Sequence, residues 1–223
     1  MGLTRRPACY IPRDTQLCTY RVKVRSEFLV SIADRVFESI KKYELGDLEN
    51  ALIQLCIAVD ATSKREFPGT KKVGDRFRAF VRSNLDIVTF SMFGDCVPMF
   101  KVGEHSMEAF IYKVLRCGLL HEGELSERFK FVEIGELIAI GANKWRVPKT
   151  FLFGLTLAVV GARSNFRESL PVDFKVWWCH KQFNFSELWG QSQLIREAMV
   201  PTDYFYMINL NAIELPASGG DPT

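Results

Sequence analysis

Residues 112–125, YKVLRCGLLHEGEL, are the stretch around which the rest of this chain is organised. In it, an apolar helical pattern gives way to an acidic turn that contains glycine. Arg116 and His121, with four residues between them, lie at this boundary. The pair is either part of a functional site or only the end of a helix, and the surrounding sequence bears on that choice.

The composition fits one main domain with extensions. A chain of 223 residues, of which 48% are hydrophobic, can bury a substantial core. The formal charge of +3 and the pI near 8.5 neither demand nor exclude a nucleic-acid partner.

Three features predict a soluble, cytoplasmic protein without a membrane partner. The six cysteines have no CxxC pair and no regular spacing, which is typical of free thiols in a reducing compartment. Arg5 and Arg6 are not followed by the apolar core of a signal peptide. The most apolar run, residues 151–162, is shorter than the roughly 20 residues that span a bilayer.

Hydrophobic periodicity predicts a mainly α fold, an antiparallel helical bundle over residues 27–170. Its helices are expected from a cap at Ser26 to about Tyr43, from Leu48 to at most Pro68-Gly69, over residues 71–93, over 104–121, and from Pro148 to about Arg163.

Other segments depart from this helical pattern. Residues 127–147 carry apolar runs separated by glycines and predict a small inserted β-hairpin. Residues 1–26 form an N-terminal arm, either a basic flexible segment or an edge strand. Residues 171–223 form a mixed, aromatic C-terminal extension, whose tail from Pro216 is expected to be disordered.

Two sets of charged residues stand out on the earlier helices. Asp60 and Lys64, one turn apart, are either an exposed ion pair or accessory residues of a site formed with a later helix. Arg76, Arg78 and Arg82 lie outside the apolar stripe of the third helix, where arginines either meet phosphate or form an ordinary solvated face.

Metal and thiol chemistry fit the stretch poorly. Cys117 and His121 lie about one turn apart, but a closed zinc site needs four ligands, and Cys179-His180 is poorly spaced to supply them. Cys117 as a nucleophile with His121 as its base lacks an obvious third member. We therefore expect neither a metal nor a cofactor.

Arg116 and His121 suit RNA cleavage without a metal. That reaction needs a base for the 2′-OH proton, an acid for the leaving 5′ oxygen and a cation for the charge on phosphorus. One chain supplies one such histidine, so two chains related by a two-fold axis would complete the cleft. On an ideal helix the two side chains lie roughly 140° apart, so the pair converges only if the helix loosens.

The motif Arg116-Cys117-Gly118-Leu119-Leu120-His121 resembles the signature of HEPN domains, an arginine and a histidine separated by four to six residues late in a helical bundle. The resemblance covers roughly residues 27–165. Cys117 stands where the family often has a polar residue, and Gly123 where many toxin members have tyrosine.

The resemblance implies a homodimeric, metal-independent endoribonuclease of toxin-antitoxin or antiviral defence systems. Arg116 would stabilise the transition state, and His121 would act as base or acid. Glu122 would either tune His121 or be a solvated turn residue. The cleaved RNA would carry a 2′,3′-cyclic phosphate, and an antitoxin or sensor protein would be a possible partner.

Two alternatives remain open from the sequence. Arg116 and His121 can simply interact with the dipole at the C-terminal end of a helix. The protein can also be a non-catalytic dimeric binding module for a protein or nucleic-acid partner.

Overall fold

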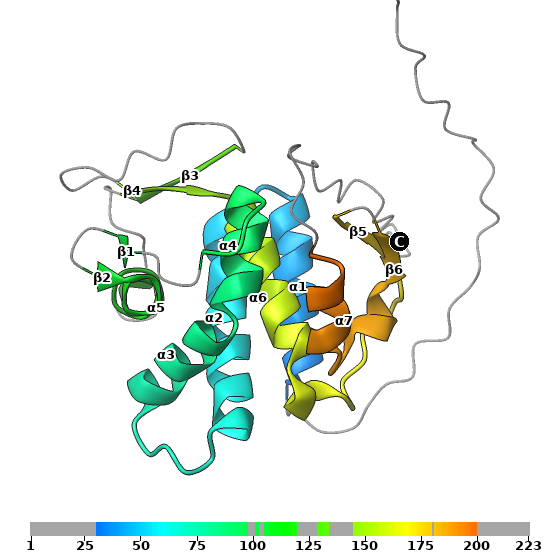
Figure 1. Ribbon diagram of the computed structural model, residues 1–223, viewed down its shortest axis with the longest axis horizontal. Coiled ribbons are helices and arrows are strands. Elements are labelled where there is room, and N and C mark those ends of the chain that lie inside the picture. Colours follow the sequence, from blue (N-terminus) through cyan, green and yellow to red (C-terminus); the bar gives the residue numbers. More distant parts are fainter. Residues whose placement is uncertain are drawn as a thin grey trace, which may run out of the picture.

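The fold is taken from a computed structural model, which describes residues 30–97, 101–102, 105–119, 129–133, 145–179 and 181–199. Within these residues the fold is mainly α, with three small sheets of two strands each, as Figure 1 shows. The predicted mainly α class is confirmed.

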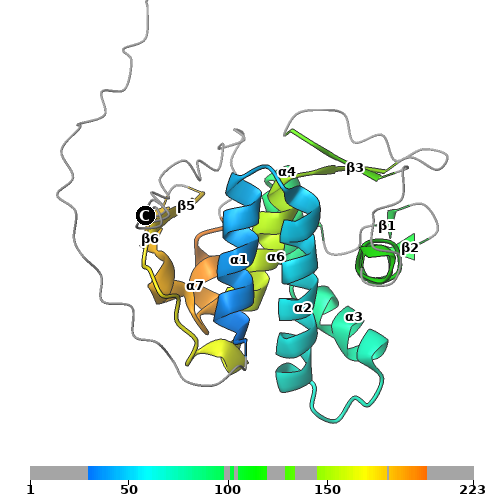
Figure 2. The same cartoon turned by 180° about the vertical axis from the view of Figure 1, so that it is seen from behind.

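The centre of the fold consists of α1 (Ile32–Glu44), α2 (Leu48–Glu66), α4 (Leu85–Phe93) and α6 (Thr150–Gly161). Every residue of α6 is buried, and this helix packs against both α2 and α4 (Figures 1 and 2). Since α6 has no polar face to expose, the other helices must surround it.

The first helix begins later than the predicted cap at Ser26. Ser31 caps α1, accepting from the Asp34 N–H at 3.0 Å, while the Asp34 carboxylate accepts from the Ser31 N–H at 2.8 Å. This reciprocal capping box fixes the start of the helix locally.

The predicted single helix over residues 71–93 is wrong, because the chain breaks it at Asn84. α3 (Val73–Ser83) packs on α2 and the later α5, whereas α4 enters the core beside α6. The Asn84 amide nitrogen donates to the Phe80 carbonyl at 2.9 Å, which helps to satisfy the end of α3 at the break.

The next segment forms a short helix that widens. After the two-residue strands β1 (Lys101–Val102) and β2 (His105–Ser106), α5 (Met107–Phe110) continues directly into the π-helix η1 (Ile111–Arg116). The predicted helix over residues 104–121 thus begins at Met107, and residues 120 and 121 lie outside the described part.

The predicted hairpin over residues 127–147 is also wrong. β3 (Phe129–Val132) and β4 (Trp145–Pro148) are neighbours, but they pair in parallel, with Phe129 opposite Trp145. Parallel strands cannot be joined by a tight turn. Pro148 ends β4 instead of opening α6, and the Lys149 N–H donates to the Val132 carbonyl at 3.0 Å.

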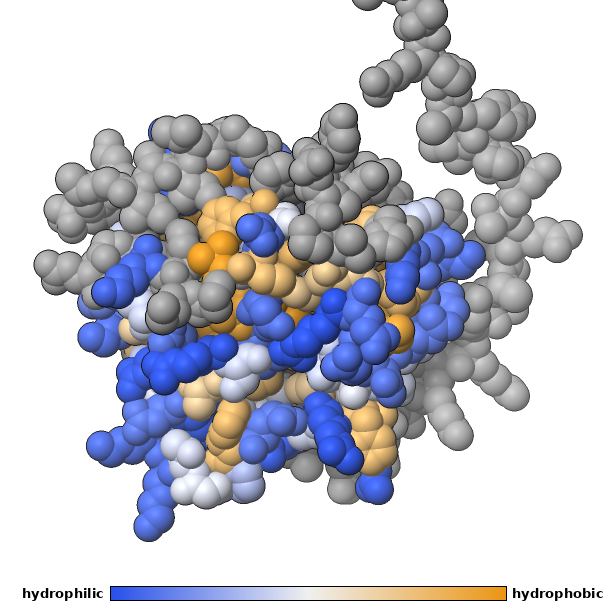
Figure 3. Space-filling view, in the orientation of Figure 1, coloured by the Kyte–Doolittle hydropathy of each residue, from blue (hydrophilic) through white to orange (hydrophobic). Residues whose placement is uncertain are grey.

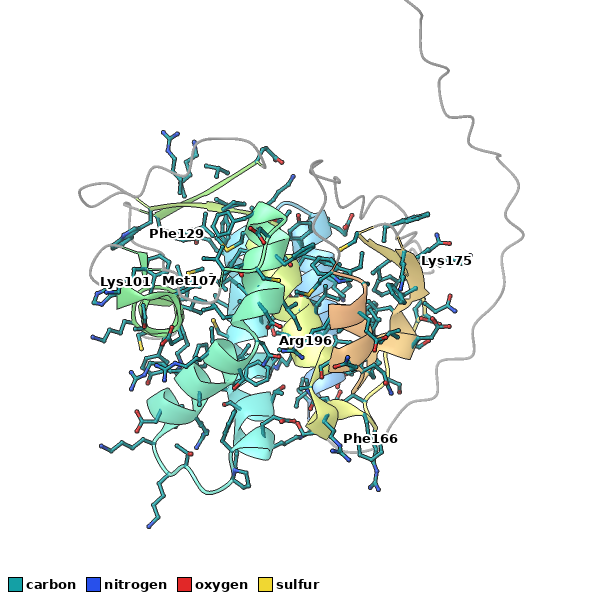
Figure 4. The ribbon with its side chains drawn as sticks, in the orientation of Figure 1. Lys101, Met107, Phe129, Phe166, Lys175 and Arg196 are labelled. Atoms are coloured by element: carbon teal, nitrogen blue, oxygen red, sulfur yellow. The ribbon has the colours of Figure 1, made fainter. Side chains whose placement is uncertain are left out.

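The C-terminal extension packs into the same core as the helices. It follows η3 (Arg163–Asn165) and comprises the antiparallel strands β5 (Lys175–Trp178) and β6 (Lys181–Asn184), η4 (Phe185–Leu188) and α7 (Ser192–Glu197). Trp178 is buried and donates to the Ile195 carbonyl at 3.0 Å. Arg196, labelled in Figure 4, binds the Asp86 carboxylate at 2.6 Å and so ties α7 to α4.

Candidate functional site

Arg116 of η1 and Asp60 of α2 form an ion pair. Arg116 Nη2 lies 2.8 Å and Nε 3.2 Å from Asp60 Oδ2. The two side chains are 14% and 21% exposed, so the pair lies partly beneath the surface. Both residues stood out in the sequence. They lie 56 positions apart in the chain, and the structure brings them into contact.

Asp60 therefore binds an arginine on another helix. Of the two alternatives left open by the sequence, the exposed Asp60–Lys64 ion pair is not the one that forms. Lys64 is exposed one turn further along α2. Burial acts to lower the pKa of Arg116, but hydrogen bonds and the charge of Asp60 outweigh it and raise that pKa. Arg116 is thus a permanent cation at this position.

The π-helix changes the geometry expected for Arg116. A π-helix closes its hydrogen bonds from residue i to i+5, so it turns less per residue than an α-helix. The offset of roughly 140° between Arg116 and His121 belongs to an ideal α-helix and does not apply to a segment that loosens from Ile111 onward. His121 and Glu122 lie outside the described residues.

Tyr112 connects Arg116 to α3. The guanidinium carbons of Arg116 and Arg78 lie 5.5 and 5.4 Å from the centre of the Tyr112 ring, both within cation–π distance. Gly74 makes this close approach possible, because a Cβ atom there would lie 2.7 Å from Tyr112 Cζ. Helix α3 and η1 are therefore held together by one aromatic ring and the charges around it.

The outer face of α3 carries two arginines, Arg78 and Arg82, whose positions are fixed by carboxylates. Arg78 Nη2 lies 2.6 Å from Asp75 Oδ1, and Arg82 binds Glu108 Oε1 through Nη2 at 2.6 Å and Nε at 3.0 Å. These arginines, with Asp75 and Ala79, line a shallow depression of about 250 Å³. The surface over α3 is largely hydrophilic in Figure 3.

The two partners of the Arg82–Glu108 ion pair differ in their exposure to solvent. The Arg82 side chain is 70% exposed and the Glu108 side chain only 6%. Burial acts to raise the pKa of Glu108, but hydrogen bonds from Arg82 and its charge outweigh it and leave that pKa lowered. Glu108 is therefore a fixed anion that orients a solvent-facing guanidinium.

The buried thiol of Cys56, near Arg116, is unsuited to nucleophilic chemistry. Cys56 lies one turn before Asp60, and burial raises its pKa far above the ordinary thiol range. Cys117 follows Arg116 and is partly buried. Among the described residues, Cys56, Cys96 and Cys117 are free thiols.

The described part of the chain has no group of three or more histidine, cysteine, aspartate or glutamate side chains placed to hold one metal ion. None of the helices in that part is both long and apolar enough to cross a membrane.

Sequence reasoning missed Tyr112 and Gly74 as members of the site. Tyr112 lies four residues before Arg116, a spacing that would place both on one face of an α-helix. Gly74 within a helical pattern was the other available signal, since an unexplained helical glycine often marks close packing.

The fold and site together define a mainly α protein with an ion pair between α2 and η1 and a cationic face on α3. The chain belongs to the Rv1289 family, whose model matches residues 31–212. Its relatives include uncharacterized protein Rv1289 of Mycobacterium tuberculosis and uncharacterized protein Mb1320 of Mycobacterium bovis. Each is 29% identical over 185 residues, covering 75% of this chain and 87% of the relative. No solved structure matches this chain significantly.

The resemblance to HEPN domains is corrected by this finding. The family model that matches residues 31–212, which include Arg116, is that of the Rv1289 family and not of HEPN domains. An arginine and a histidine at a spacing of four residues are a short pattern that recurs by chance. The toxin-antitoxin and defence setting, and the antitoxin or sensor partner, rested on that resemblance and are not proposed.

Proposed function

We propose that this protein is a binding module that holds RNA by its phosphate backbone on the outer face of α3. The observation that carries the proposal is the depression lined by Arg78 and Arg82, each held in place by a carboxylate. Guanidinium groups match phosphate geometry and bind it most strongly when they are already oriented.

The local charge supports an anionic partner. Residues 71–83 contain five basic residues and one acidic residue, whereas the whole chain carries only +3. The Arg78 guanidinium carbon lies 5.4 Å from the centre of the Tyr112 ring, and this contact restricts the arginine side chain, which reduces the entropy lost on binding. Mild overall charge combined with one strongly basic helix favours a localised phosphate contact.

The test is fluorescence anisotropy with a labelled single-stranded RNA and, in parallel, a DNA of the same sequence. The double variant Arg78→Ala/Arg82→Ala is expected to bind RNA at least tenfold more weakly. Arg163→Ala/Arg167→Ala removes the same charge from two exposed positions at and after η3 and serves as the matched control. Equal loss in both double variants, or no RNA binding by the wild type, would contradict the proposal.

Salt dependence provides a second readout. Each phosphate contact on a single strand contributes about −0.7 to the slope of log K against log salt. Removing Arg78 and Arg82 should therefore make that slope shallower by roughly 1.4. Tighter binding to DNA than to RNA would redirect the proposal to DNA.

A second candidate is metal-independent RNA cleavage, with His121 as base or acid beside Arg116. It is favoured by one observation, the fixing of Arg116 by Asp60 in a widened helix five positions before His121. Wild type and His121→Ala are incubated with RNA in EDTA. Cleavage by the wild type alone, with both proteins folded, supports this function, and no cleavage by the wild type rejects it.

Oligomeric state tests the two-histidine cleft separately. Acid and base chemistry from one histidine per chain needs two chains. Light scattering after size exclusion should then give a dimer. A strict monomer would leave the binding function intact and exclude the paired cleft.

A further inference from the structure

Asp75 is an unexpected member of the depression on α3. The depression has a volume of about 250 Å³, and Asp75 lines it together with Arg78, Ala79 and Arg82. Helix α3 lies at the periphery of the helical centre in both ribbon views (Figures 1 and 2). A site for phosphate alone would gain nothing from a carboxylate in its wall, because like charges repel. The position of Asp75 therefore needs a reason beyond phosphate binding.

The two carboxylates that orient the arginines differ in exposure. Glu108, which holds Arg82, has a side chain that is only 6% exposed, whereas the side chain of Asp75, which holds Arg78, is 49% exposed. Glu108 shows that an arginine of this face can be oriented by an acid that is hidden from a ligand. Asp75, in contrast, presents its charge to whatever occupies the depression.

One oxygen of Asp75 remains available to a ligand. Oδ1 accepts from Arg78 Nη2 at 2.6 Å, and within the described part of the chain no residue donates to Oδ2. Ala79, one helical turn after Asp75, contributes only a methyl group to the wall. An ionised carboxylate accepts hydrogen bonds and donates none. The depression therefore suits a ligand that carries an anionic group for the arginines and a hydrogen-bond donor beside it.

A ribonucleotide unit carries both groups close together. Its 2′-OH is attached to the carbon next to the one that bears the 3′-phosphate, whereas deoxyribose has no hydroxyl at this position. The 2′-OH, which can donate as well as accept, allows proteins to distinguish RNA from DNA. The volume of the depression is just below the roughly 300 Å³ at which small-molecule sites begin, which fits one sugar–phosphate unit.

We propose that Asp75 selects RNA over DNA, with Oδ2 accepting a hydrogen bond from a ribose 2′-OH while Arg78 and Arg82 hold the adjacent phosphate. This inference rests on the proposed RNA-binding function and adds the residue that recognises the sugar. The same carboxylate also orients Arg78 through Oδ1. The phosphate contacts are common to RNA and DNA, whereas the contact through Oδ2 forms only with ribose.

The test compares three labelled single strands of one base sequence by fluorescence anisotropy on the full chain. The strands are RNA, DNA with uracil in place of thymine, and 2′-O-methyl RNA, which keeps the sugar oxygen and the phosphates but has no hydrogen to donate. A hydrogen bond to a charged group corresponds to about tenfold or more in affinity. The wild type should therefore bind RNA at least tenfold more tightly than either of the other strands.

Asp75→Ala should reduce the preference for RNA over each of the other strands to within about threefold. Release of Arg78 weakens binding to all three strands alike, so the ratio of affinities isolates the sugar contact. Glu38→Ala is the matched control, because Glu38 is an exposed carboxylate in an i,i+3 pair with Lys41 on α1. This control should keep the wild-type ratio.

The outcomes separate the role of Asp75 from the function on which it rests. Equal affinity of the wild type for RNA and either other strand, or a wild-type ratio in a folded Asp75→Ala variant, overturns the role of Asp75 and leaves phosphate binding by Arg78 and Arg82 intact. The same loss of preference in Glu38→Ala also overturns it, because the effect would then be one of overall charge. A wild type that binds none of the three strands overturns both proposals.

Discussion

Asp60 and Arg116 form an ion pair at a position with limited access to water. Removing one partner leaves the other poorly solvated, which costs several kcal/mol when a pair is fully buried. Because this pair keeps some exposure, we expect Asp60→Ala to lower the free energy of unfolding by about 2 kcal/mol. A double-mutant cycle with Arg116→Ala, measured by urea denaturation, should give a coupling energy of about 1 kcal/mol. Strict additivity would show that the pair is energetically unimportant.

Glu108 should make stability depend on pH on the acid side. Its pKa is lowered in the folded protein, so its stabilising effect is present above the ordinary carboxyl pKa of about 4.3 and is lost as pH falls through the lowered value. Thermal unfolding between pH 6 and pH 3 should therefore show a steeper loss in the wild type than in Glu108→Gln. Identical slopes in the two proteins would contradict this linkage.

Single residues were predictable only when their signal was local. Asp60 was noticed because a carboxylate interrupts an amphipathic helix, but its partner lies on a helix 56 positions away. Arg116 was noticed through its spacing to His121, and the contact that fixes it came from α2 instead. Sequence spacing identifies candidate charges, whereas tertiary packing determines which charges pair.

At the scale of elements, the contact between α3 and η1 depends on a missing side chain at Gly74. Gly74→Ala would place Cβ 2.7 Å from Tyr112 Cζ, and the ring cannot move without weakening its contacts with Arg78 and Phe77. We expect a loss of about 1–2 kcal/mol in the free energy of unfolding, despite the better helix propensity of alanine. Gly69→Ala, where a Cβ atom meets nothing within 4 Å, is the control and should be nearly neutral. A stabilised Gly74→Ala variant would refute the close contact.

Elements were predicted well where their ends are encoded nearby. α2 matches its prediction because Asp47 and Pro68-Gly69 bracket an uninterrupted apolar stripe. The break at Asn84 was missed because α3 and α4 are both apolar enough to continue, and only their different packing partners separate them. The strands β3 and β4 were correctly recognised as extended, yet their parallel pairing depends on the course of the chain between them.

At the scale of the whole molecule, the helical class followed from periodicity, but the role of the C-terminal extension did not. Trp178, Phe185 and Ile195 belong to the same hydrophobic core as α6. Their spacing has no helical or strand period, because they reach the core from a hairpin, a 3₁₀ turn and a short helix. Aromatic residues without a period can therefore belong to the core of a domain.

The start of the core at Ser31 gives a prediction about the whole chain. The capping box closes the first turn of α1, and Glu168 Oε2 accepts from the Ala33 N–H at 3.1 Å, so two contacts from Ser31 onward hold the start of α1. The family model also begins at residue 31. We expect a chain that starts at residue 30 to melt within about 2 °C of the full chain in a scanning calorimeter. A chain that starts at residue 35 loses the capping box and the Glu168 contact, and it should melt several degrees lower. Equal melting temperatures for the two truncations would show that neither contact fixes the start of the core.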